Sequence, residues 1–339
     1  MGDTRTFASF SCNCSPLKKT SFFNTHLLFV SPYILQCRGA CCICIVTQSG
    51  VFALREGYFK GWYFRCCAGE ESVAFIPAYH TSGQHTQISL QVITKQTTAQ
   101  IPLRVLKYRE RPLHIALPGC TFGEEGIVLH RAQDSFPIEG VLRFGSPMRP
   151  QYDIMGPFAC VPRMQCRHRL YSLRHTVNGN ITIGSQTLQF SSGWGYIEGD
   201  RGYSFPNNYV WTQSFLPNGS VMLSAADIPL CGTRFTGIIA SVVLHGHEYR
   251  LATYLGAKIT HLQQNSITVT QGKYTLTAKL LHENAQPLAA PVHGNMCLRS
   301  IHESVACTAY YRFATDKNVL CECISDCAAF EWEHSGLKI

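Results

Sequence analysis

Two acidic residues in a segment rich in glycine and aromatic residues are the strongest candidates for chemistry in this chain. Glu198 and Asp200 lie two positions apart within Gly195-Tyr-Ile-Glu-Gly-Asp-Arg-Gly-Tyr-Ser-Phe-Pro206. On a β-strand, residues separated by two positions point to the same face. Like charges held that close disfavour double ionisation, and apolar surroundings favour the neutral form of a carboxyl group. The pair could therefore supply one carboxylate and one neutral acid, and the neutral acid could protonate an alkene in a cavity that excludes water.

Aromatic side chains that could stabilise the resulting cation accompany this pair. The segment 57–65 holds five aromatic residues in nine positions. The faces of aromatic rings attract cations, and the candidates for this role are Trp62, Tyr63, Trp194, Tyr196 and Trp211. The alternative is structural: Arg65 or Arg201 would pair with the carboxylates, and the aromatic rings would fill a barrel core.

Two histidines lie in an arginine-rich segment before the acidic pair. His168 could hydrogen-bond to a phenol or relay a proton, and we predict His175 as a substrate-binding residue. Seven positions separate them, so on one regular strand they point to opposite faces and need not form one site. The alternative for each is a satisfied core histidine. Cys166 lies beside His168, but no third residue is evident that would orient a thiol nucleophile.

The elements that position these residues are predicted to be β-strands. From Val51 onward, short apolar–polar alternations are separated by turn residues, and no stretch keeps a 3.6-residue period for three turns. Hairpins are predicted at Gly184-Ser185, at His245-Gly246-His247 and at Gln271-Gly272. The fold class is therefore all-β and mainly antiparallel. About 290 residues of this pattern exceed one ordinary sandwich, which favours two barrel or sandwich units, predicted over residues 51–200 and 201–339.

Residues 1–50 differ from the rest and are predicted to be a cysteine-rich, poorly ordered extension. They contain six of the 17 cysteines, but the spacing Cys37-x3-Cys41-Cys42-x-Cys44 matches no zinc or iron–sulfur motif. We therefore expect reduced thiols in a cytoplasmic protein and no metal. The apolar run 27–35 after Lys18 and Lys19 leaves a targeting segment open, whereas a membrane span would need about 20 uninterrupted apolar residues.

The motifs that are absent and the distribution of charge argue against several classes of function. No dinucleotide-binding, P-loop, G-x-S-x-G or H-E-x-x-H motif occurs. The net charge is +8, but the Lys and Arg residues are dispersed rather than clustered with aromatic residues, which argues against nucleic-acid binding. Only 15% of residues are charged, below the usual ~25%. This scarcity favours a lipophilic small-molecule ligand, with transient contact to a membrane surface as a further possibility.

The chain resembles the tocopherol cyclase family. The motif F-[EK]-G-W-Y-[FY]-[KR] corresponds to Phe59–Arg65, and G-Y-I-E-[GK]-[DN]-[WR]-G-x-x-F-P corresponds to Gly195–Pro206, followed by an aromatic-W-x-Q tail that ends at Gln213. Further similarity covers Tyr152–Pro157, Met164–His168, Ser172–His175 and Phe330–Glu333. The resemblance spans roughly residues 57–333. Asp200 and Arg201 stand where the plant pattern has asparagine and an aromatic residue.

The resemblance implies two lipocalin-like β halves and no metal or redox cofactor. It also implies the reaction of the family's named enzyme, which is protonation of the prenyl double bond of a prenylated quinol and capture of the tertiary cation by the phenol oxygen. Many bacterial homologues of the family occur without an evident tocopherol pathway, so the resemblance does not carry the identity of the substrate. Two alternatives remain open: a non-catalytic lipid or isoprenoid carrier, and an isoprenoid hydratase or isomerase. A buried acid that opens into an aromatic cavity would favour an enzyme. The predicted catalytic residues are Glu198, Asp200 and His168, and the predicted substrate-binding residues are Trp62, Tyr63, Tyr196, Trp211, Gln213 and His175.

Overall fold

The computed structural model describes residues 45–46, 57–83, 85–132, 135–162, 164–230, 233–292 and 295–333. The predicted extension 1–50 and its cysteines lie outside the described residues, apart from Ile45 and Val46. The described chain is built from β-strands with two short 3₁₀ helices, η1 (Gly156–Cys160) and η2 (Thr253–Leu255). No helix among these residues is long and apolar enough to cross a membrane.

The first sheet has twelve strands in the order β1-β6-β7-β8-β9-β10-β11-β12-β2-β3-β4-β5. All pairs are antiparallel except β1 with β6. The strands are β1 (Ile45–Val46), β2 (Tyr58–Ala68), β3 (Glu71–Ser82), β4 (His85–Thr94), β5 (Thr98–Leu103), β6 (Leu106–Glu110), β7 (Leu113–Leu117), β8 (Cys120–Gly123), β9 (Gly126–Arg131), β10 (Ile138–Phe144), β11 (Cys166–Ile183) and β12 (Gln186–Gly202).

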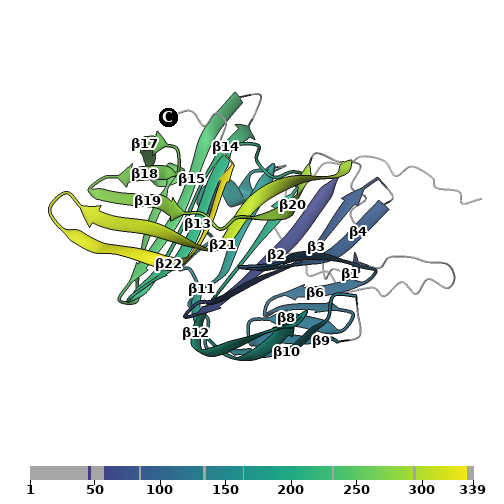
Figure 1. Cartoon of the computed structure of the whole chain (residues 1–339). Helices are drawn as coiled ribbons and strands as arrows, with labels where there is room; N and C mark the ends of the chain where they lie inside the picture. Colours follow the sequence, from purple (N-terminus) through teal and green to yellow (C-terminus); the bar gives the residue numbers. More distant parts are fainter. Residues whose placement is uncertain are drawn as a thin grey trace, which may run out of the picture. The chain divides into compact units, whose positions relative to one another are not determined.

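The second sheet has ten antiparallel strands in the order β16-β15-β14-β13-β22-β21-β19-β18-β17, with β20 also pairing β21. Figure 1 shows the first sheet in purple to teal and the second in green to yellow. The strands are β13 (Tyr209–Leu216), β14 (Gly219–Leu230), β15 (Thr233–Leu244), β16 (His247–Ala252), β17 (Lys258–Gln263), β18 (Ser266–Gln271), β19 (Tyr274–His282), β20 (Gln286–Val292), β21 (Asn295–Thr315) and β22 (Val319–Glu333).

The three predicted hairpins are confirmed, and their turn residues explain them. Gly184 links β11 to β12 with a φ of 60°, and Gly272 links β18 to β19 with a φ of 54°. Glycine adopts this left-handed conformation at little cost because it lacks a Cβ atom. The turn between β15 and β16 is His245-Gly246, with β16 beginning at His247.

Three apolar clusters hold the strands together. One lies within the first sheet, around Phe64, Phe75 and Phe122, and a second lies within the second sheet, around Tyr311 and Phe313. A third cluster takes residues from both sheets, such as Tyr63, Tyr196, Trp211, Val305 and Ala329. Burial of apolar surface there, worth about 25 cal/mol per Å², holds the two sheets against each other.

The predicted fold class is therefore confirmed: the protein is all-β, mainly antiparallel and made of two packed lipocalin-like halves. The described chain passes from the first sheet to the second between Gly202 and Tyr209. The division into domains at residues 200 and 201 stays a prediction. Cys66 and Cys67 on β2 are free thiols, as are Cys321 and Cys323 on β22.

Candidate active site

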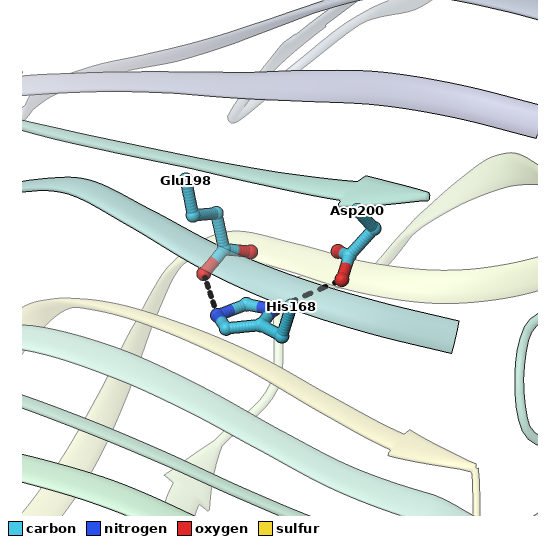
Figure 2. A group of neighbouring side chains, drawn as sticks. All are labelled: His168, Glu198 and Asp200. Carbon is cyan, nitrogen blue, oxygen red and sulfur yellow. Dashed lines mark hydrogen bonds and ion pairs between the residues drawn. The ribbon is translucent and has the colours of Figure 1, made fainter. Parts of the chain in front are cut away.

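The candidate site begins on β12, which lies between β11 and β2 in the first sheet. Glu198 and Asp200 point to the same side of this strand, as their spacing predicted, and converge on one imidazole ring (Figure 2). That ring belongs to His168 of β11, which is the direct cross-strand neighbour of Asp200. Residues opposite each other in an antiparallel pair share a face of the sheet, so the register of β11 against β12 builds the cluster.

His168 lies between the two carboxylates. Its Nδ1 is 3.0 Å from Asp200 Oδ1, and its Nε2 is 3.1 Å from Glu198 Oε2, an ion-pair distance outside hydrogen-bond geometry. Burial alone would lower the pKa of His168, but the charges of Glu198 and Asp200 hold it well above its usual range. The ring is therefore an imidazolium near neutral pH. The partner of both carboxylates is this histidine, and neither Arg65 nor Arg201 takes the role that the structural alternative gave them.

Glu198 is also bonded from both sheets. Its side chain accepts hydrogen bonds from the Tyr196 hydroxyl on its own strand and from Trp211 Nε1 of β13, the latter at 3.3 Å. Glu198 is only 5% exposed. Hydrogen bonds to a charged acceptor are stronger than neutral ones, so these donors fix the carboxylate where the two sheets meet.

A cavity of about 170 Å³ opens beside this cluster, and its walls come from both sheets. His168, Glu198 and Asp200 line it together with Tyr63 and Trp211. Most of the remaining wall is apolar and includes Phe59, Met155, Phe158, Phe205, Phe235 and Leu288. An apolar pocket with a few converging polar groups is typical of a small-molecule site.

A second pair of carboxyl groups lines the same cavity. Glu303 of β21 lies directly opposite Glu331 of β22. The Tyr63 hydroxyl donates to Glu303 Oε1 at 2.5 Å, and the Tyr209 hydroxyl donates to Glu331 Oε2 at 2.5 Å. Burial raises the pKa of Glu303 to about 7 and holds that of Glu331 well above its usual range.

Arg65 is fully buried, and its charge acts on Glu303, but its hydrogen bonds go to other groups. Its guanidinium donates to Gln213 Oε1 at 2.7 Å, to the carbonyl oxygen of Val305 at 3.0 and 3.1 Å, and to that of Cys327 at 2.9 Å. Arg65 therefore ties β2 to β13, β21 and β22. Gln213, a predicted substrate-binding residue, is fully buried as its partner and does not line the cavity.

The remaining predicted residues divide between the cavity and its support. Trp62 lines the cavity together with Tyr63 and Trp211, whereas Tyr196 supports Glu198. His175 does not line the cavity: its Nδ1 lies 2.8 Å from the Ser172 hydroxyl, and its ring packs 4.4 Å from that of Phe144. Burial lowers the pKa of His175 to about 3, so it is a neutral core histidine.

A polar groove adjoins the cavity at His168 and Asp200, which line both. In the groove, buried Lys60 forms an ion pair with Glu110, and Glu110 also accepts from Arg169 at 3.0 Å and from the Tyr171 hydroxyl at 2.5 Å. Further basic residues on its walls are Arg111, Arg167 and Arg201. The groove gives the apolar cavity one polar end.

The same cluster has the donor atoms of a possible metal site. His168, Glu198 and Asp200 each offer a ligand atom, and these atoms lie within 4.8 Å of one another. One imidazole and two carboxylates form a donor set that suits a divalent cation. However, each ring nitrogen already faces a carboxylate oxygen, so a metal would have to displace one of the ion pairs. The absence of a metal stays a prediction.

Sequence reasoning did not assign a role to Glu303, Glu331 or Tyr209. Glu331 belongs to the similar segment Phe330–Glu333, where Glu331 and Glu333 alternate with aromatic residues, and this was the available signal. The only sequence signal for Glu303 was its position as a charged residue just before the apolar run Val305–Cys307. Only the pairing of β21 with β22 brings the two together.

No protein-family model matches the chain, and no curated protein matches it. Among solved structures, CghA bound to Sch210972 is similar with a TM-score of 0.55 and 10% identity, over 82% of this chain and 89% of CghA. A second structure of CghA gives a TM-score of 0.53 over 82% and 88% of the two chains, also at 10% identity. At this identity the likeness shows a shared fold. Fold and site together define a two-sheet lipocalin-like protein with a carboxylate-lined internal cavity.

Proposed function

We propose that this chain is a tocopherol cyclase-like enzyme that cyclises a prenylated quinol, or a related lipophilic ring compound, after protonation of an alkene. The observation that carries the proposal is the Glu198–His168–Asp200 cluster, which places charged groups against an apolar, aromatic cavity. A carrier needs the cavity but has no use for buried charges, whose desolvation costs several kcal/mol per ion. The motif resemblance over residues 57–333 supports the same activity.

The polarity of the cavity suggests how such a substrate would lie. The phenolic ring would face His168 and Asp200, where the cavity meets the polar groove, and the prenyl chain would lie among Phe158, Phe235 and Leu288. Apolar walls exclude water, which would otherwise trap the cation before the ring closes.

The Glu198–His168–Asp200 cluster then has two roles. The carboxyl oxygens of Glu198 and Asp200 stabilise a tertiary cation in the cavity, assisted by the ring of Trp211. As the phenol oxygen attacks the cation, the cluster accepts the phenol proton. We therefore propose that the pair expected to contain the neutral acid acts as base and charge stabiliser.

Conservative substitutions test the proposal. Glu198→Gln and Asp200→Asn should each lower turnover of a prenylated hydroquinone by at least about 100-fold, with the folded state preserved. The readout is conversion followed by mass spectrometry, and Glu139→Gln, on the exposed side of β10, is the matched control. If both site variants convert the probe at the wild-type rate, the cluster has no part in catalysis.

The same experiment separates the alternative functions. A product of unchanged mass indicates cyclisation or isomerisation, and a product heavier by one water indicates a hydratase. Binding of the prenylated hydroquinone without conversion by wild type indicates a lipid carrier. Cytoplasmic location, transient membrane-surface contact and the absence of nucleic-acid partners remain proposals made from the sequence.

A further inference from the structure

The cyclisation proposed above needs a proton donor, and the second carboxyl pair has the geometry of one. Glu303 and Glu331 are direct cross-strand neighbours on β21 and β22, and both line the cavity. Side chains in this relation have Cβ atoms about 4.5–5.5 Å apart, and like charges placed there repel. Water screens this repulsion at a surface, but Glu303 is fully buried. One shared proton removes the repulsion.

The hydrogen-bond partners of this pair are phenols. Tyr63 donates to Glu303, and Tyr209 donates to Glu331. Among the described residues, no salt bridge joins either carboxyl group to Lys, Arg or His. Glu303 Oε2 is buried and has no hydrogen-bond partner. A buried carboxylate oxygen without a donor is costly, whereas a protonated carboxyl group in the wall of the cavity holds a proton that it can donate.

A single chain of contacts connects this pair to the Glu198–His168–Asp200 cluster. Tyr63, which binds Glu303, is the cross-strand neighbour of Glu198. Trp211, which donates to Glu198, is the cross-strand neighbour of Glu331 and packs against Tyr63 with ring centroids 5.5 Å apart. The two carboxyl pairs therefore border one aromatic compartment, with Tyr63 and Trp211 between them.

We propose that the Glu303–Glu331 pair holds one proton near neutral pH and is the proton donor of the cavity. The inference rests on the proposed function. The O–H bond of Glu303 breaks as the π electrons of the alkene form a C–H bond, which leaves a tertiary carbocation and a carboxylate. A lone pair of the phenol oxygen then forms the C–O bond, and the phenol proton passes to the Glu198–His168–Asp200 cluster. That proton returns to Glu303 before the next turnover, so substrate and product are isomers.

The first test measures the shared proton directly. Infrared difference spectra of the full chain, titrated from acid to alkaline pH, should contain a protonated-carboxyl band that persists at pH 7. Glu303→Gln together with Glu331→Gln should abolish this band. The matched control is Glu322→Gln, because Glu322 also lies on β22 and accepts from a phenol, that of Tyr310, but is exposed. A wild-type spectrum without the band at pH 7 overturns the inference.

The second test measures the donor role with a prenylated hydroquinone that carries one trisubstituted alkene. In D₂O, wild type should place one deuterium on the alkene carbon, and Glu303→Gln should lower this rate by at least about 100-fold. Glu303→Asp should restore part of it. Full activity in Glu303→Gln and Glu331→Gln, with loss in Glu198→Gln, refutes the inference and leaves the proposed function standing. A wild type inert to the probe refutes the proposed function and the donor role, and the infrared band still decides the shared proton.

The pH profile of kcat/KM gives a readout that a merely structural role would not move. Activity should fall as pH rises through about 7, because the donor loses its proton, and Tyr63→Phe should raise that midpoint by removing a hydrogen bond that lowers the pKa of Glu303. An unmoved midpoint in Tyr63→Phe contradicts the assignment. The other ionisable groups that face the pair are Arg65 of β2, Tyr209 of β13, and Glu198 and Asp200 of β12.

Discussion

The Glu198–Asp200 pair of the first sheet and the Glu303–Glu331 pair of the second line one cavity and consist of nearly the same side chains. The first pair is two residues apart on one strand and has an imidazole between its carboxylates. The second pair faces across two strands and is bonded to phenols alone among the described hydrogen bonds. The first pair therefore has a cation between its carboxyl groups, and the second pair has none among the described residues.

This difference shows how one cavity can hold both a base and an acid near the same pH. Burial disfavours the charged form of any carboxyl group, and the outcome depends on whether a cation offsets that cost. Burial is the main influence on the pKa of Glu303, because the N–H groups of Arg65 donate to Gln213 and to backbone carbonyl oxygens instead.

Removing the cation from the first pair should have the largest effect. His168→Leu leaves two carboxylates unpaired and should lower the free energy of unfolding at pH 7 by about 3–5 kcal/mol. The loss should shrink at pH 5, because unpaired carboxylates take up protons. Urea denaturation at both pH values measures it, with His261→Leu, at an exposed position of β17, as the control. An equal loss at both pH values would mean that only packing had been removed.

The second pair should make the protein less stable as pH rises. The pKa of Glu303 lies at about 7 in the folded state, above that of an unfolded glutamate, so its contribution is complete in acid and lost as pH rises through about 7. Between pH 5 and 8 this loss is roughly 2–3 kcal/mol. Glu303→Gln should remove that part of the slope in urea titrations. A variant as pH-dependent as wild type would show that Glu303 is ionised throughout.

His175 shows what burial does without a carboxylate, on the same strand as His168. Its pKa of about 3 lies below that of an unfolded histidine, so its contribution is present above about 6.5 and is lost as pH falls. Wild type should lose about 2 kcal/mol from this residue between pH 7 and 5. His175→Gln should lack this loss and keep the proposed activity. A large loss of activity would place His175 in the site after all.

Removing one tyrosine hydroxyl that donates to each carboxyl pair should give the smallest effect. Tyr196→Phe removes a donor to a charged carboxylate, which costs about 1.5–3 kcal/mol, whereas Tyr63→Phe removes a donor to a neutral carboxyl group, which costs about 0.5–1.5 kcal/mol. The difference between the two variants at pH 7, about 1 kcal/mol, is the quantity to measure by urea denaturation. Equal costs would mean that both carboxyl groups have the same charge.

The parts of the fold that depend on local sequence could be predicted. Glycine turns at Gly184 and Gly272 joined alternating strands as expected, and the period of two placed Glu198 and Asp200 on one face. Strand order could not be read locally, because nothing near β2 specifies that it pairs with β12. Side-chain burial was also out of reach for Gln213, whose partner Arg65 lies 148 residues away.

The candidate site was predicted in part for the same reason. His168 was predicted from its residue type. Its place between two carboxylates depends on the pairing of β11 with β12, which brings it next to Asp200, 32 residues further along the chain. For His175, the register shifts of β11 between Leu170 and His175 mean that the spacing from His168 does not fix its face, so the expectation of opposite faces stays a prediction. Glu303 and Glu331 meet only because β21 and β22 pair. The sequence around a single acidic residue in a strand does not indicate which residue lies opposite it.

Arg65 connects β2 to Val305 and Cys327, which lie 240 and 262 residues further along the chain. Contacts of such long sequence separation form late in folding, because loop closure costs entropy before any contact energy is gained. During synthesis, β2 and β3 leave the ribosome long before β21 and β22 exist, and domains generally fold in that order. The cavity takes its walls from both sheets, so ligand binding reports that the strands of both sheets have come together.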